Sequence, residues 1–130
     1  DLSPEDEERF LLTTDILVLP YLDCDTLAMS SVLVKGLAAG CAVLVSNVKA
    51  FSEVIEHGQN GLLVPPHDPQ ALAQYLSYLI GQRRQTALLG AEARRRSERC
   101  NTWPVVADRI AELYAAVLGN VPAQHDRRTP

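Results

Sequence analysis

Two adjacent serines, Ser30 and Ser31, separate a polar loop from an apolar pattern with helical spacing. Serine is a preferred residue at the amino cap of a helix. The first turn of a helix presents free N–H groups and a partial positive charge, which together bind anions. The amides of Met29, Ser30 and Ser31, with the two hydroxyls, are therefore a candidate diphosphate site, because charge-assisted hydrogen bonds are short and strong. The alternative is that the serines only cap their helix.

Lys35 follows Ser31 by one helical turn, so both side chains are expected on the same side of the helix. Lysine carries a compact cation that can meet a phosphate. Lys35 is therefore the candidate residue for the nucleotide edge of the site, and the alternative is that it meets only water. The remaining side of this helix is apolar and is expected to pack on a sheet: Val32, Leu33, Gly36 and Leu37.

No pattern in the sequence indicates a metal site or a disulfide framework. His57 and His67 lie in turns, without a second histidine at metal-ligand spacing. The three cysteines are an odd number and lack a C-x-x-C motif, so they are expected to be reduced thiols. An arginine-rich stretch over 83–99 is interrupted by glutamates and lacks aromatic residues, which favours a solvated helix face over nucleic-acid binding.

The composition is that of a water-soluble globular chain. Of 130 residues, 47% are hydrophobic and 22% charged, and the net charge is -4. A chain of this length supports one apolar core. Because no apolar run reaches about 18 residues and no signal peptide is recognisable, the sequence predicts a cytoplasmic protein without a transmembrane segment.

Short apolar runs alternate with helical patterns along the chain. Continuous β-branched and aliphatic runs predict buried parallel strands over 15–20, 42–46 and 62–64. Helices are expected over 3–13, 31–40, 50–56, 69–81, 82–99 and 103–118. This alternation predicts an α/β, Rossmann-like parallel sheet with flanking helices, in a domain over residues 1–118 with a flexible tail over 119–130. Ligands bind such sheets at the carboxyl ends of the strands, where the Ser30 helix begins.

Several stretches, in this order, resemble a known family. They are the segments over 15–21, 38–46, 51–55, 57–66 and 68–73, and Trp103 with Leu113 and Tyr114. Together they resemble the donor-binding domain of GT-B glycosyltransferases of the retaining, glycogen-synthase-like group. The resemblance covers nearly the whole chain up to Leu118. It implies a partial carboxy-terminal domain of a protein with two Rossmann-like halves, the acceptor being held by the other half.

The resemblance also assigns roles to positions in the Ser30 region. In the family a glutamate at the start of the helix touches the donor sugar, the next amides bind the diphosphate, and a second glutamate accepts hydrogen bonds from the ribose. The amides correspond to the stretch over 28–31, whereas the two glutamates correspond to Leu27 and Lys35. Leucine cannot bind a sugar hydroxyl, and lysine has donors only. Either Asp23 or Asp25 supplies a displaced acid and Lys35 meets a phosphate, or the site has lost its activity.

The resemblance therefore implies part of a hexosyltransferase that uses a nucleotide-diphosphate sugar and an acceptor hydroxyl of a glycan or small molecule. It implies no metal ion and no cofactor other than the donor. Its partner is the missing amino-terminal domain, without which the chain is expected to be inactive. The alternative is a non-catalytic domain of the same fold that serves as a partner or scaffold. A third possibility, an unrelated flavodoxin-like domain, requires a sheet that closes within these residues.

Overall fold

The computed structural model describes residues 3–22, 30–100 and 102–119. Its internal contacts divide the chain into two compact units, residues 1–98 and 99–130. The elements alternate as the sequence predicts: α1 (Pro4–Leu12), β1 (Ile16–Leu19), α2 (Ser31–Ala39), β2 (Ala42–Ser46), α3 (Lys49–Ser52), β3 (Leu62–Val64), α4 (Pro69–Gly81), α5 (Arg83–Cys100) and α6 (Trp103–Gly119). The expected tail lies outside the described residues except for Gly119, which ends α6, so the domain boundary at 118 stays a prediction.

Three parallel strands form one sheet in the order β1-β2-β3. Leu44 of β2 is in register with Val18 of β1 on one side and with Leu62 of β3 on the other. All five residues of β2 are buried, which explains the uninterrupted apolar run over its first four residues, 42–45. The predicted α/β fold with a parallel sheet is therefore confirmed.

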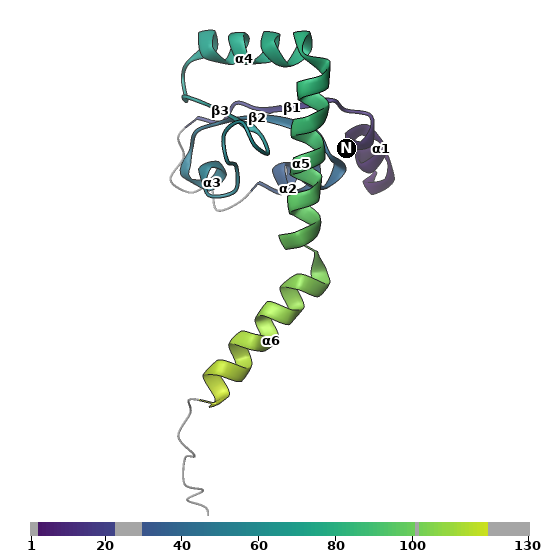
Figure 1. Ribbon diagram of the computed structural model, residues 1–130, viewed down its shortest axis with the longest axis vertical. Coiled ribbons are helices and arrows are strands. Elements are labelled where there is room, and N and C mark those ends of the chain that lie inside the picture. The colour runs from purple at the N-terminus through teal and green to yellow at the C-terminus, as the bar shows by residue number, and fades with distance from the viewer. Residues whose placement is uncertain (1–2, 23–29, 101, 120–130) are drawn as a thin grey trace, which may run out of the picture. The chain divides into compact units, whose positions relative to one another are not determined.

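Helices cover both faces of this sheet (Figure 1). Val43 and Val45 face α2 and α3, where they pack with Leu33, Leu37 and Phe51. Ala42 and Leu44 face the opposite side, in a cluster with Leu79 of α4 and Leu89 of α5. The alternation of side chains along β2 thus divides the core into two layers, one on each side of the sheet.

Within the described residues, β1 pairs only with β2 and forms an edge of the sheet. The sheet therefore does not close inside the part of the chain that the structure describes. Among the described residues, the sheet is not the closed one that a self-contained flavodoxin-like domain was expected to have. This observation agrees with a sheet that is completed by strands outside this part of the chain.

The helix predicted over 50–56 is shorter than expected, because α3 ends at Ser52. The buried side chain of Asn60 explains the difference. Its Oδ1 accepts a hydrogen bond from the amide of Glu56 at 2.8 Å, and its Nδ2 donates to the carbonyl of Val54 at 3.1 Å. These bonds satisfy the backbone groups of a turn in place of helical partners.

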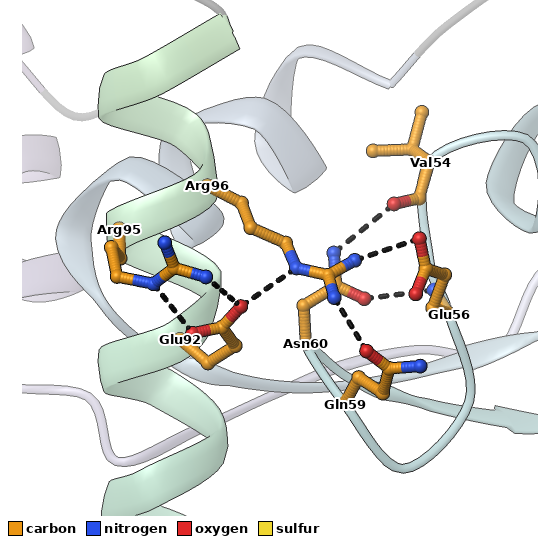
Figure 2. A network of polar contacts seen from close by, with 7 residues as sticks. All are labelled: Val54, Glu56, Gln59, Asn60, Glu92, Arg95 and Arg96. Carbon is orange, nitrogen blue, oxygen red and sulfur yellow. Dashed lines mark hydrogen bonds and ion pairs between the residues drawn. The ribbon is translucent and has the colours of Figure 1, made fainter.

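Arg96 connects α5 to the turn that Asn60 organises (Figure 2). Its guanidinium lies 2.9 Å from Glu56 and 2.8 Å from Glu92, and it donates to Gln59 at 2.6 Å. Arg95, the residue before Arg96, donates two hydrogen bonds to the same Glu92. The predicted solvated arginine face is therefore an ordered network of ion pairs on the surface of α5.

The network predicts a specific acid sensitivity. Hydrogen bonds from Arg95 and Arg96 lower the pKa of Glu92 from 4.5 to about 2. A carboxylate whose pKa is lowered in the folded state adds stability above its ordinary pKa and loses that contribution as the pH falls toward the folded value. Urea unfolding from pH about 4.5 down to about 2 should show a shallower loss of stability for Glu92→Gln than for the wild type.

Glu98→Gln is the matched control for this measurement, because it removes the exposed pair with Arg94 on the same helix. An unchanged pH slope in Glu92→Gln would contradict the assignment of this acid sensitivity to Glu92.

Candidate diphosphate-binding site

The site predicted at Ser30 lies where β1, β2 and β3 end. Helix α2 follows β1 and returns along the sheet, so its amino end lies at the carboxyl edge of the strands. Ser30 is the amino cap: its backbone is extended, and its Oγ accepts a hydrogen bond from the amide of Leu33 at 3.3 Å. The residue is 7% exposed, so the predicted cap is confirmed and its hydroxyl bonds to the helix.

The capping bond fixes which amides remain for a ligand. The amide of Leu33 donates to Ser30 Oγ, and that of Val34 donates to the carbonyl of Ser30 at 3.2 Å. The amides of Ser31 and Val32 come earlier in the first turn, where a helix offers no partner. These two N–H groups and the exposed hydroxyl of Ser31 are the described groups of the candidate diphosphate site, and their contact with a diphosphate stays a prediction. The sequence reasoning missed Val32, although the register of the cap would have identified it.

Met29, which was predicted to contribute an amide, lies outside the described residues. The same is true of Leu27 and of the two candidate acids, Asp23 and Asp25. Their assignments therefore stay predictions. The described part of the site consists of the cap, the first turn of α2 and the strand ends.

Lys35 has a partner that the sequence did not reveal. Its Nζ lies 2.6 Å from Glu7 Oε2, which links α2 to α1, and its side chain is 51% exposed. Both residues line a groove of about 450 Å³ between the two helices, with Leu11, Ala38 and Arg94 among its other walls. An ammonium group has three donors, so the ion pair leaves Lys35 further hydrogen-bonding capacity. Its contact with a nucleotide stays a prediction.

A second, smaller cavity of about 160 Å³ opens at the carboxyl edge of the strands. We call it the strand-end cavity. It is lined by residues that follow the three strands and by the start of α4: Pro20, Tyr21, Leu22, Ser46, Val64, Pro65, His67, Asp68, Pro69 and Leu72. His67 has a φ of 60°, in the left-handed region, and is exposed. His67, which the sequence places in a turn, thus also borders a cavity.

The described thiols show no arrangement for nucleophilic chemistry. Cys41 is buried with its Sγ 3.4 Å from the carbonyl of Leu11, and burial raises the pKa of this thiol. Cys41 and Cys100 are both free, and Cys24 lies outside the described residues. Within residues 3–22, 30–100 and 102–119, no group of three or more histidine, cysteine, aspartate or glutamate side chains could hold a metal ion. None of the helices described in the structure is long and apolar enough to span a bilayer.

The cap predicts a measurable contribution to stability. Ser30→Ala removes the acceptor for Leu33 N and is expected to destabilise the chain by about 1 kcal/mol in urea unfolding. Ser31→Ala is the control, because it removes an exposed hydroxyl at the first helical position and leaves the cap in place; its effect should stay within about 0.5 kcal/mol. Equal losses in the two variants would show that Ser30 does not stabilise α2 as a cap.

Comparison with known proteins agrees with this geometry. The family model described as glycosyl transferases group 1 matches residues 3–82, which contain the sheet, α2 and the whole of α4. The chain belongs to this family. Its matched region includes Ser30, Ser31 and Lys35, so the candidate site lies inside the domain that defines the family.

Two curated members of the family are phosphatidyl-myo-inositol mannosyltransferases. The protein from Mycobacterium leprae is 40% identical over 66% of this chain and 23% of its own length. The protein from Mycolicibacterium smegmatis is 34% identical over 82% of this chain and 27% of its own length. The chain therefore spans about a quarter of the length of these relatives.

A solved structure with the same fold is that of Anabaena Alr3699/HepE in complex with UDP. It superposes with a TM-score of 0.76 at 21% identity, over 83% of this chain and 29% of that protein. At this identity the similarity establishes the fold, which is that of the GT-B glycosyltransferases.

Proposed function

We propose that this chain is the sugar-nucleotide-binding part of a glycosyltransferase that moves a sugar from a nucleotide diphosphate to an acceptor hydroxyl. The observation that carries the proposal is the pair of amides, Ser31 and Val32, at the amino end of α2 and at the carboxyl edge of the sheet. The family's mannosyltransferases and the neighbour solved with UDP support the same ligand class.

The chemistry of this site is electrostatic. As the bond between the sugar and the diphosphate breaks, negative charge grows on the leaving oxygens. Two N–H groups and the partial positive charge of α2 stabilise that charge without reorganising. Lys35 adds a cation if its exposed ammonium group turns from Glu7 toward the nucleotide. In this scheme neither a metal ion nor a cofactor other than the donor takes part.

The proposed partner is the remainder of a longer glycosyltransferase, in the cytoplasm. Helix α6 has no buried residue, and its exposed apolar side chains recur at helical spacing: Trp103, Ile110, Leu113, Tyr114 and Val117. An exposed apolar face of this kind is removed from water only when another protein surface packs against it. The acceptor, a glycan or a small molecule, would bind to that partner, so the chain alone is expected to bind the donor without transferring its sugar.

The alternative is a non-catalytic domain that has kept the fold and lost the ligand. Family membership favours the transferase, whereas lysine at position 35 favours the alternative, because it cannot accept a hydrogen bond from a ribose hydroxyl. Calorimetric titration with a panel of UDP- and GDP-sugars distinguishes the two. Saturable binding of at least one donor is the expected result. If no donor binds, the transferase is excluded and the non-catalytic domain is the remaining explanation.

A further inference from the structure

The strand-end cavity has the chemical character of a site for a neutral, hydroxyl-rich ring. Besides Tyr21, three of its lining residues carry polar side chains: Ser46, His67 and Asp68. Together they offer a hydroxyl, an imidazole and a carboxylate, and so both donors and acceptors. The other seven lining residues are prolines, aliphatic residues and a tyrosine, which suit the C–H surface of a sugar. No lysine or arginine lines the cavity, so its charge does not favour a phosphate.

The size of the cavity limits its occupant. Its volume of about 160 Å³ is below the roughly 300 Å³ at which pockets for drug-sized ligands begin. A whole sugar nucleotide therefore does not fit, whereas a single ring does. The cavity opens at the edge of the sheet where α2 begins, and Tyr21 leads from it into the segment before Ser30.

The side chain of Asp68 is held in place because it also caps helix α4. One of its carboxylate oxygens, Oδ1, accepts a hydrogen bond from the amide of Ala71 at 2.8 Å and caps α4. This bond fixes the direction of the side chain. A carboxylate accepts through both oxygens, so Oδ2 keeps acceptor capacity for a ligand.

His67 occupies its place at a conformational cost. It is the only residue other than glycine with a positive φ in the part of the chain that the structure describes. A side chain in this region of backbone space costs about 1–3 kcal/mol, whereas glycine adopts it freely. The fold thus holds an imidazole beside the cavity where glycine would be less strained.

We propose that the strand-end cavity is a subsite for one sugar ring, whose hydroxyls bind His67, Asp68 and Ser46. The inference rests on the proposed function, since the ring is that of a donor whose diphosphate binds at the start of α2. It accounts for sugar recognition in a chain that has leucine at position 27, where the family has a sugar-binding glutamate. It also adds a determinant of donor specificity that lies about 40 residues after Leu27 in the sequence.

Two variants test the subsite without removing the diphosphate site. His67→Gly deletes the imidazole and relieves the backbone, so its melting temperature should equal or exceed that of the wild type. Asp68→Asn replaces the carboxylate and keeps a good cap, because asparagine and aspartate are equivalent there. The readout is the ratio of affinities for a UDP- or GDP-sugar and for the same nucleotide without its sugar, measured by calorimetry.

In each variant this ratio is expected to fall about 5–10-fold, as for one lost hydrogen bond, with the affinity for UDP or GDP itself unchanged. An unchanged ratio in both folded variants would overturn the subsite while leaving the diphosphate site intact. Failure of the wild-type chain to bind any nucleotide would instead overturn the proposed function, and the subsite with it.

Discussion

Replacing Phe51 by alanine is expected to lower the free energy of unfolding by about 3–5 kcal/mol, the range for a fully buried aromatic side chain. Phe51 is the largest of the fully buried side chains, with 0% exposure. It belongs to the core cluster between α2, α3 and the sheet, and its ring centroid lies 5.1 Å from that of Tyr21. Because Tyr21 lines the strand-end cavity, the substitution should also loosen the edge where we propose that the donor binds.

Urea unfolding monitored by circular dichroism measures this loss. The expected loss is a large part of the 5–15 kcal/mol that stabilises an ordinary domain, so the midpoint should fall sharply. Phe51→Leu is the control, since it keeps most of the apolar volume and should cost no more than about 1.5 kcal/mol. A loss below 1 kcal/mol for Phe51→Ala, on the scale of an ordinary surface change, would show that Phe51 is not a central core residue.

The second large effect is expected at Gly90, where α5 contacts the start of β2. A methyl group on Gly90 would lie 2.1 Å from the carbonyl oxygen of Gly40 and 3.3 Å from the amide of Ala42. Both are backbone atoms that cannot turn aside. Gly90→Ala must therefore displace the helix, and we expect a loss of about 3 kcal/mol, at the upper end of the range for overpacked cores.

Gly81→Ala is the matched control, because it makes the same change at a position with no atom within 4 Å of the added carbon. At the end of α4 this change should be neutral or stabilise the chain by up to about 1 kcal/mol. The two variants are compared by their melting temperatures. Similar values for both would contradict the close contact between α5 and the turn at Gly40.

Capping residues, helix-ending glycines and apolar runs predicted the helix ends and the strands. Ser30 caps α2 as the sequence predicts, and Ser3 and Asp68 cap α1 and α4 in the same way. Gly40 ends α2 in the left-handed conformation, with a φ of 87°. The uninterrupted apolar runs became the parallel strands, because both faces of the sheet are covered. Each of these features is set by residues within about one turn of one another.

The features that escaped prediction depend on contacts distant in sequence or on one backbone angle. The partner of Lys35 is 28 residues away in α1. Two partners of Arg96, Glu56 and Gln59, lie on the turn before β3. Helix α3 ends early because the side chain of Asn60 bonds to the backbone of the turn that follows it. The local sequence of the helix does not predict these bonds. His67 shows no sign in the sequence of its positive φ. At the candidate site, the amide of Val32 is identified by the hydrogen bond of the cap, which places Val32 in the first turn of α2.

The most direct test of the diphosphate site is a titration of the isotope-labelled chain with UDP and with GDP, followed by the NMR shifts of its backbone amides. We expect the amides of Ser31 and Val32 to show the largest saturable shifts, and the residues of the strand-end cavity to respond further when a sugar is attached. Shifts centred on the groove between α1 and α2, or no saturable shift at the start of α2, would contradict this expectation.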